Sequence, residues 1–447
     1  MNQDARATVA ERLGDYIAAT QDGNVPAEVR HQATRCLVDW LGLALAGSRE
    51  PLGEMLLAVC DAMAGPPQAT IVGRGRHRAT DAALLNGAQA HALDFDDTIV
   101  AVHFHPTAPI MSAAVALAEW RGLGGAPLLT AYVVGLEVAT RLAVALHDRL
   151  LDCGWHPTGV VGTVGAAAAC ARLLALDVAQ AASALGIATS QAAGLRENFG
   201  TMTKPLHPGQ AAASGLLAAL LAARGYTAAA TAFEGSAGFC RAFGSGEFDF
   251  DAALADLGTN RWALANAFKP YPCGVLSHAA IDAAIALHGA FRPEEIATVE
   301  CQVSPTTATI VSKRAPRTGL EGKFSLTYCV AAGLCDGHVG VATFSDEAVA
   351  RPAVRALEAR VHVLADARVG DDQAALRVEG PAGARRDLRI AAAKGSVGSP
   401  MSDGDLEAKY LDLARGVLAP EQAQRLLERA WRVGELADIG ELLALAR

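Results

Sequence analysis

The chain has few aromatic residues and no stretch that is rich in basic residues. Phenylalanine, tryptophan and tyrosine make up 5% of the 447 residues, whereas apolar residues make up 51%. This alanine-rich composition favours closely packed helices over a β-sandwich, because alanine has the best helix propensity and lets helix axes approach. The formal net charge is −9. Together with the lack of basic–aromatic interleaving, it argues against nucleic acid as a partner.

The cysteines lack the spacing of a metal site or a disulfide framework. There are nine, an odd number, and no C-x-x-C motif occurs. This pattern indicates reduced thiols and argues against a zinc ribbon or an iron–sulfur cluster. The first twenty residues have acidic side chains and no apolar core segment, and the apolar stretch near 211–223 is too short to span a bilayer. We therefore expect a cytoplasmic protein without a membrane partner.

The apolar pattern predicts two domains, the number expected for a chain of this length. Up to about residue 265, long segments repeat apolar residues at helical spacing and end in glycine. Four short β-branched segments follow, which predict strands, with a helix among them near 323–337. We predict a mainly α protein. A large helical domain would comprise residues 1–267 and 403–447, and a smaller α+β lid domain would comprise residues 268–402.

Residues 91–107, HALDFDDTIVAVHFHPT, concentrate titratable side chains. They contain His91, Asp94, Asp96, Asp97, His103 and His105. Aspartate is a preferred helix cap, and Thr107 is the predicted cap of the next helix, so one interpretation is purely structural. A second is a metal site of Asp94, Asp97 and His105, since carboxylates and imidazoles bind divalent ions. A third is an acid–base site with at most one catalytic histidine from 103 and 105, because residues two apart on a strand face opposite ways.

Three further segments place polar side chains beside proline or glycine. They are GWHPTGVVGTVG with His156, MTKPLHPGQ with Lys204 and His207, and KPYPCGVLSH with Lys269, Tyr271 and His278. Proline and glycine mark element boundaries, where binding sites are usually built. Lysines set between apolar helices are costly to bury unless they meet an anion. The alternatives are a turn-forming histidine and solvated surface lysines.

The glycines at 159, 162 and 165 form G-x-x-G-x-x-G, which differs from the dinucleotide motif G-x-G-x-x-G. No predicted strand precedes them. They indicate either tight helix packing or a helix that begins close to a ligand.

Eight segments, taken in order and spacing from about residue 10 to 440, resemble the MmgE/PrpD family. They read NGAQAHALDFDDT, HPTAPIMSAAVALAE, GVVGTVGAAAACARLLALD, ALGIATSQAAGL, MTKPLHPGQAAASGLLAALLAARGYT, FKPYPCGVLSHAAIDA, KFSLTYCVAAGL and GSPMSDGDLEAKY. The family includes 2-methylcitrate dehydratase, cis-aconitate decarboxylase and iminodisuccinate epimerase. The resemblance implies a large helical domain, a smaller α+β lid and a homodimer. It also implies an active site between the domains that uses no metal and no organic cofactor.

The resemblance also implies roles for individual residues. The motif D-F-x-D-T supplies Asp94 and Thr98, and two histidines and two lysines complete the implied site. These are His105, His156, Lys204 and Lys269, with Tyr328 as a further carry-over. From the polar segments we add His103, His207 and Tyr271 as substrate-binding residues. The spacer IVAVHF departs from the family in its extra histidine and its apolar character, which is consistent with a different substrate.

The family's reactions share one difficulty, because negative charge builds on a carbon beside a carboxylate. Preorganised lysines offset that charge, histidines move the proton, Asp94 orients a neighbour and Thr98 binds a carboxylate. We predict a cofactor-independent lyase or isomerase for a small di- or tricarboxylate. A 2-methylcitrate dehydratase-like reaction comes first on family prevalence, then epimerisation of an iminodisuccinate-like acid, then cis-aconitate-type decarboxylation. The rivals are a non-catalytic carboxylate-binding protein and a metal-dependent hydrolase.

Overall fold

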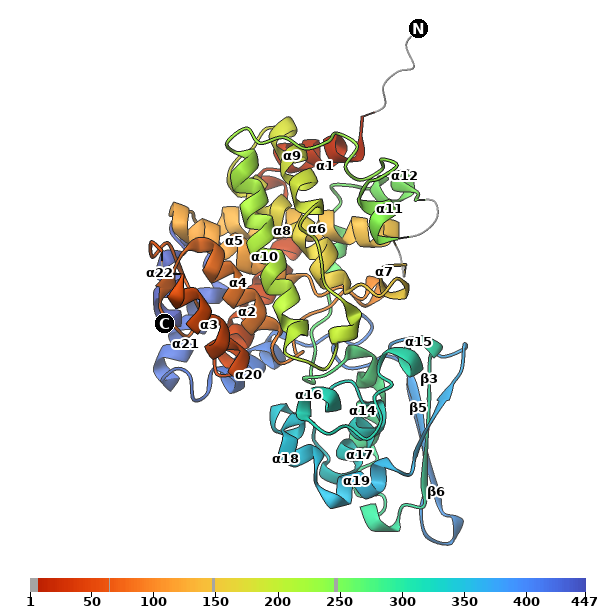
Figure 1. The fold of residues 1–447 in the computed structure, drawn as a ribbon. Coiled ribbons are helices and arrows are strands. Elements are labelled where there is room, and N and C mark those ends of the chain that lie inside the picture. The colour runs from red at the N-terminus through yellow and green to blue at the C-terminus, as the bar shows by residue number, and fades with distance from the viewer. Residues whose placement is uncertain (1–6, 64, 147–148, 245–247) are drawn as a thin grey trace.

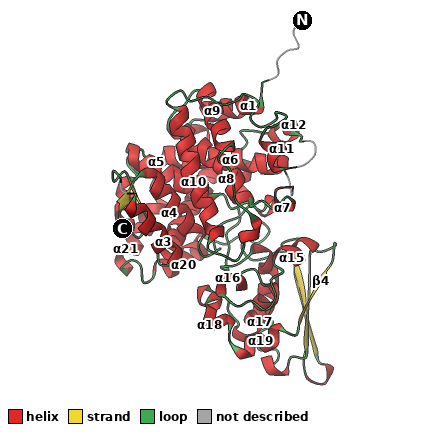
Figure 2. Cartoon of the chain, in the orientation of Figure 1, coloured by secondary structure: helices red, strands yellow, loops and turns green. Residues whose placement is uncertain are grey.

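In the computed structural model the chain is mainly helical, as the sequence predicts (Figure 2). The structure describes residues 7–63, 65–146, 149–244 and 248–447. Most helices form one large group, and the remaining ones lie beside a four-stranded sheet (Figure 1). We call these the helical unit and the second unit.

The helical unit is built on long helices whose residues are buried nearly all round. Those that carry or support the site are α2 (Ala27–Gly47), α4 (Ala79–His91), α5 (Thr107–Arg121), α6 (Gly125–Leu146), α8 (Pro157–Leu173), α9 (Val178–Thr189) and α10 (Thr203–Ala222). Others are α1 (Val9–Ala19), α3 (Pro51–Ala62), α7 (Arg149–Asp152), α11 (Phe239–Phe243), α12 (Phe250–Leu254) and α13 (Arg261–Leu264). α8 packs against α5, α6 and α10. Because small apolar residues occupy every face of these helices, they form the centre of one large core.

Glycines set the spacing between the central helices. A Cβ atom at Gly165 would lie 2.8 Å from the carbonyl oxygen of Gly135, across the contact of α8 with α6. One at Gly215 would lie 2.5 Å from the Cβ of Ala166, between α10 and α8. Both distances are shorter than the contacts that a real Cβ atom makes. The run 159–165 therefore includes a glycine that serves tight helix packing, one of its two predicted roles.

Among the described residues, α6 is the only helix whose length and composition would allow it to cross a membrane. It is longer than the apolar stretch near 211–223 that the sequence analysis singled out. Its most apolar window is 89% buried inside the protein, as in the core helix of a globular fold.

The second unit has its own hydrophobic core, with buried residues from Cys273 to Ala393. Its strands are β3 (Thr298–Val303), β4 (Val361–Ala365), β5 (Ala374–Glu379) and β6 (Arg385–Ile390). Their order is β4-β3-β5-β6, with β3 and β4 parallel and the other pairs antiparallel. Alternate residues of β3 and β5 are buried. All four predicted strands are confirmed.

Helices cover one face of this sheet (Figure 1). The helices of the second unit are α14 (His278–Ala286), α15 (Pro305–Ile310), α16 (Gly319–Gly322), α17 (Leu326–Asp336), α18 (Asp346–Val349) and α19 (Pro352–Glu358), of which α14, α15 and α17 contact the strands. α14 packs on β5 and α17 on β4. The helix predicted near 323–337 is confirmed as α17.

The chain then returns to helix. The last helices are α20 (Asp403–Ala414), α21 (Pro420–Trp431) and α22 (Gly440–Leu443). α20 packs against α2 and contributes Tyr410 and Leu413 to the large core. The division of the chain at residues 268 and 402 stays a prediction. One short ribbon, β1 (Ala69–Thr70) with β2 (Arg76–His77), was not predicted, because two-residue strands are too short to show alternation.

Candidate active site

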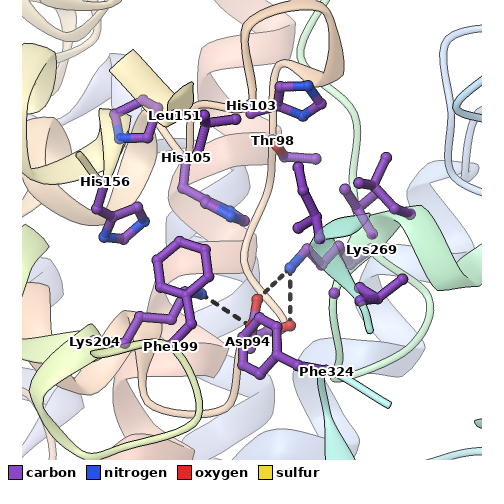
Figure 3. Close-up of a pocket in the computed structure, with 16 residues that line it drawn as sticks. Asp94, Thr98, His103, His105, Leu151, His156, Phe199, Lys204, Lys269 and Phe324 are labelled. Carbon is purple, nitrogen blue, oxygen red and sulfur yellow. Dashed lines mark hydrogen bonds and ion pairs between the residues drawn. The ribbon is translucent and has the colours of Figure 1, made fainter. Parts of the chain in front are cut away.

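A cavity of about 50 Å³ lies where the helical unit meets the second unit (Figure 3). Its polar lining consists of Asp94, Thr98, His103, His105, His156, Lys204 and Lys269. Its apolar lining includes Leu151, Phe199, Val275, Leu276, Ile310, Val311 and Phe324. Four polar segments that lie far apart in the sequence therefore meet around one cavity.

The cavity is organised by the turn that follows α4. Asp94 has a left-handed backbone with a φ of 52°, a conformation that aspartate tolerates better than most residues. Thr98 then exchanges two backbone hydrogen bonds with Ala267, at 2.8 and 2.9 Å. This pairing ties the aspartate-rich turn to the segment that leads directly into Lys269.

The aspartates do not cap the next helix. No side chain caps the start of α5, and Pro106 occupies its cap position. Thr107, the predicted cap, is instead the first helical residue, and its hydroxyl donates to the carboxylate of Asp97. The side-chain amide of Asn266 also donates to that carboxylate. Asp97 is therefore held in a polar pocket behind the cavity, and burial raises its pKa to about 7.

On one side of the cavity, Asp94 lies between two lysines (Figure 3). Its carboxylate oxygens lie 2.9 Å from Nζ of Lys204 and 2.5 Å from Nζ of Lys269. All three side chains are almost completely buried. Burial alone would raise the pKa of Asp94, but the charges of Lys204 and Lys269 outweigh it and hold the pKa well below its usual range. The solvated-surface interpretation of the two lysines is wrong.

Lys204 begins the first turn of α10 and passes between two aromatic rings. Its Nζ lies 5.2 Å from the ring centroids of both Phe199 and Phe324, within the range of cation–π attraction. Burial lowers the pKa of Lys204, although Asp94 opposes this effect. The result is an ammonium group in a largely apolar setting, where its interaction with a bound anion would be strong.

The other side of the cavity carries imidazoles. His105 Nδ1 lies 2.8 Å from the backbone carbonyl oxygen of Asp97. Because a carbonyl only accepts, Nδ1 carries the proton, and the other ring nitrogen, Nε2, is left for the cavity. Burial lowers the pKa of His105 to about 3, with a further contribution from Lys269. The ring is therefore neutral at physiological pH when nothing is bound.

His156 occupies the cap position of α8, directly before Pro157. Its Nδ1 lies 3.0 Å from Nδ1 of His207, so one of these nitrogens donates to the other. Burial, and next the charge of Lys204, hold the pKa of His156 well below its usual range. His156 is thus a second neutral imidazole on the same side as His105.

A third imidazole, that of His91, packs against these two. Nδ1 of His91 donates to the Asp96 carboxylate at 2.7 Å. The His91 ring packs against His105 with a centroid distance of 4.9 Å and against His156 with 5.7 Å. His91 and Asp96 were noticed in the sequence but given no role, because their contacts depend on the turn that brings them under the site.

The structure also shows which side chains are spaced for a metal ion. Among the described residues, one ligand atom each from His91, Asp96 and His105 lie within 4.8 Å of one another. The predicted alternative of Asp94, Asp97 and His105 is not assembled, because the Asp94 carboxylate faces two lysines and the Asp97 carboxylate faces Thr107. The nearby ammonium groups make the cavity a poor environment for a cation.

Three of the predicted substrate-binding residues do not line the cavity. His207 contacts it only through His156. Tyr271 donates to Asp282 at 2.7 Å, and Tyr328 is fully buried in the second core, where its hydroxyl donates to the carbonyl of Thr343 at 2.5 Å. The geometry gives no support to a substrate-binding role for these tyrosines.

Two buried lysines beside the site were missed. The chain has only six lysines, and four of them are buried: Lys204, Lys269, Lys323 and Lys409. The other 32 of the 38 lysine and arginine residues are arginines. The rarity of lysine could have pointed to these two residues. On a surface arginine and lysine serve equally well, whereas a compact ammonium group is suited to a buried place where several oxygen atoms converge.

The chain matches two family models in succession. The model of the MmgE/PrpD N-terminal domain matches residues 11–251, and that of the MmgE/PrpD C-terminal domain matches residues 271–433. These two matches cover most of the chain.

Similar proteins match along almost their whole length. The chain is 28% identical over 469 residues to the cis-aconitate decarboxylase-like protein oryM of Aspergillus oryzae, covering 98% of this chain and 97% of that protein. It is 27% identical over 461 residues to the cis-aconitate decarboxylase of Homo sapiens, covering 98% and 95%. With that of Aspergillus terreus it shares 27% over 482 residues, covering 99% and 97%. The chain belongs to the MmgE/PrpD family, as its sequence predicted, and is a lyase of that type, one of the two enzyme classes that the sequence left open.

Proposed function

We propose that the protein decarboxylates a small unsaturated di- or tricarboxylate of the cis-aconitate type, without a cofactor. One observation carries this proposal. The cavity combines two buried ammonium groups with an apolar wall that includes Leu151, Phe199 and Phe324. Decarboxylation needs both features, because one carboxylate must be held while another leaves from a poorly solvated position.

The lysines keep donors available for a substrate. An ammonium group has three N–H donors. In the described part of the chain, Lys204 uses one on the Asp94 carboxylate, and Lys269 uses two on the carboxylate and carbonyl of Asp94. A substrate carboxylate can therefore bind both lysines while Asp94 stays in place.

The chemistry follows from this placement. With one carboxylate on the lysines, a second lies against the apolar wall, where it loses hydration that favours its charged form. Its C–C bond breaks, CO₂ leaves, and the electron pair stays on the carbon. That charge delocalises toward the remaining carboxylate, where Lys204 and Lys269 stabilise it.

The carbon then takes up one proton, which the imidazole side supplies. His105 and His156 are neutral in the empty site because of burial and the neighbouring lysines. A bound polyanion adds negative charge and so raises the pKa of both imidazoles. The substrate thereby converts a ring into the imidazolium that donates the proton, and the reaction takes up one proton for each CO₂ released.

The two other reactions of the family find less support. Both active imidazoles pack against His91, on one side of the cavity. An epimerase needs proton carriers on opposite faces of a carbon, so one of them would have to be a lysine. A 2-methylcitrate-type dehydratase needs a base for the α-proton and an acid at the leaving hydroxyl, so the two imidazoles would have to divide these roles, whereas decarboxylation needs one proton donor. Of the three reactions, family prevalence alone favours dehydration, whereas the lining of the cavity and the named relatives favour decarboxylation.

Proton NMR in D₂O tests the proposal. The chelator-treated enzyme is incubated with cis-aconitate, 2-methylcitrate, citrate, malate and iminodisuccinate. We expect loss of a carbon from cis-aconitate, with one deuterium in the product. A new vinylic signal with loss of the carbinol would identify a dehydratase instead. Exchange without net loss of substrate would identify an epimerase, and binding without exchange in any acid would indicate a carboxylate-binding protein.

A further inference from the structure

Three consecutive backbone carbonyl groups of the turn at 93–95 each accept a hydrogen bond from a different lysine. Nζ of Lys323 lies 2.6 Å from the carbonyl oxygen of Leu93. Nζ of Lys269 lies 3.0 Å from that of Asp94. Nζ of Lys409 lies 2.7 Å from that of Phe95. The turn therefore directs a row of carbonyl oxygens at buried cations.

These lysines come from three separate parts of the chain. Lys323 lies between α16 and α17 in the second unit, Lys269 lies where the chain enters that unit, and Lys409 belongs to α20. The turn itself belongs to the helical unit. Its conformation is thus fixed by segments that come together only when the two units and the C-terminal helices are packed.

Lys409 holds two parts of the site at once. Its Nζ pairs with the Asp39 carboxylate at 2.7 Å, and it donates to the carbonyls of Phe95 and, at 3.1 Å, Lys269. Three acceptors thus converge on an ammonium group, which has three donors. Asp39 in turn belongs to α2, at the centre of the helical unit. This contact fixes the backbone of the catalytic lysine relative to the turn that carries Asp94.

Lys323 is a different case. It is buried, and its ammonium group donates to the carbonyl oxygen of Leu93. Within the described ranges, no carboxylate forms an ion pair with it. A buried ammonium group without an ion-pair partner is costly to keep, so its retention beside the site calls for a role there.

We propose that Lys323 and Lys409 are positioning residues, which hold the left-handed turn at Asp94 so that its carboxylate lies between Lys204 and Lys269. The left-handed conformation is strained for a residue with a side chain and persists only where its surroundings fix it. Here the three carbonyl–lysine contacts fix it. Without them, the Asp94 carboxylate and the ammonium group of Lys269 are no longer held in a fixed position relative to each other. The effect on rate rests on the proposed function, whereas the effect on geometry does not.

The scarcity of lysine makes a direct test available. Lysine labelled with ¹³C at Cε gives six side-chain signals, and the exposed Lys313 and Lys394 serve as internal references. Two variants are compared with the wild type: Lys323→Met, and the double variant Asp39→Asn with Lys409→Met, which removes both members of the buried pair. We expect the signals of Lys204 and Lys269 to shift in both variants, with those of Lys313 and Lys394 unchanged.

Kinetics supply the second measurement. We expect kcat for the preferred acid to fall by about 10²-fold in both variants, the usual effect of a displacement near 1 Å. Lys313→Met, at an exposed site of the same unit, is the matched control and keeps the wild-type rate. Lys409→Arg is expected not to restore the rate, because the planar guanidinium does not fit three converging acceptors.

The two variants act on different carbonyl groups, so either one is decisive if the other fails to fold. A folded variant with wild-type Lys204 and Lys269 signals and wild-type kcat would overturn the inference. If the wild-type enzyme turns over none of the acids, the proposed function fails, but the lysine signals still decide whether Lys323 and Lys409 position the turn.

Discussion

The imidazole side and the lysine side of the cavity are assembled in different ways. His105 and His156 lie at the starts of α5 and α8, so the helical unit alone places them. Lys204 lies in the first turn of α10, whereas Lys269 lies at the entry to the second unit, and Asp94 pairs with both. In the proposed mechanism, the helical unit therefore places the groups that transfer the proton, and the junction places the groups that stabilise charge.

The charge states of the two sides also have different causes. Burial keeps the imidazoles neutral, although Nδ1 of His105 lies 3.6 Å from the Asp96 carboxylate. On the lysine side, Asp94 stays ionised because the positive charges of Lys204 and Lys269 lower its pKa by more than burial raises it. An arriving polyanion therefore acts on the two sides in different ways. It binds the remaining N–H donors of the lysines beside Asp94, and it makes the imidazoles more basic.

The largest effect should come from the imidazole side. His105→Gln and His156→Gln each remove a proton carrier, and we expect kcat to fall by about 10²–10⁴-fold. Steady-state kinetics with the preferred acid measures this, with KM changing less than kcat. His362→Gln, at an exposed position of β4, is the matched control. Normal turnover in both active-site variants would show that the proton comes from the lysine side.

The lysine side should give a somewhat smaller loss of rate and a clearer loss of binding. We expect Lys204→Met and Lys269→Met each to lower kcat/KM by about 10²–10³-fold, the range seen when one preorganised donor is removed. Each variant also weakens binding of the acid, measured by calorimetry. If Lys204→Ala and Lys269→Ala both keep near-normal turnover, the assignment of the electrophilic groups is wrong.

Two aspartates of one turn should differ in how they affect stability with pH. The pKa of Asp97 is raised to about 7, so the folded protein prefers its protonated form. The free energy of unfolding therefore falls as the pH rises from about 4, where the carboxyl ionises in the unfolded chain, to about 7, where it ionises in the folded protein. Asp97→Asn should therefore raise the melting temperature at pH 8, by about 2 °C or more, and have little effect at pH 5.

Asp94→Asn is the comparison of opposite sign. Because the folded pKa of Asp94 is lowered, its carboxylate stabilises the protein above the unfolded pKa near 4, and that contribution is lost as pH falls further. We expect this variant to lower the melting temperature at pH 8. The same direction of change for both variants at pH 8 would contradict the separation of the two carboxylates.

The smallest expected effect is that of a chelator. Because ammonium groups flank the cavity, we expect exhaustive chelation to leave kcat unchanged. A loss of activity that a divalent ion restores would instead place that ion at His91, Asp96 and His105, the group with suitable spacing. His91→Gln would then abolish the rescue.

Much of the site was predictable because its segments carry local signals. Asp94, Thr98, His105, His156, Lys204 and Lys269 stand beside prolines or in a dense polar run, and all of them line one cavity. The roles of Lys323 and Lys409 had no local signal, because each acts on a carbonyl group far away in the chain. Tyr328 is the reverse case, since this residue of a matching segment does not line the cavity and donates to a carbonyl of its own unit.

The sequence by itself determined the helical character, the four strands of the second unit and the polar residues that the site contains, because periodicity, propensity and proline–glycine boundaries are local properties. Only the tertiary structure decided the charge of those residues and their partners. Burial neutralises His105, pairing ionises Asp94, and three lysines from separate segments fix one turn. These properties depend on which groups the folded chain brings within a few ångströms, and no spacing along the sequence encodes that distance.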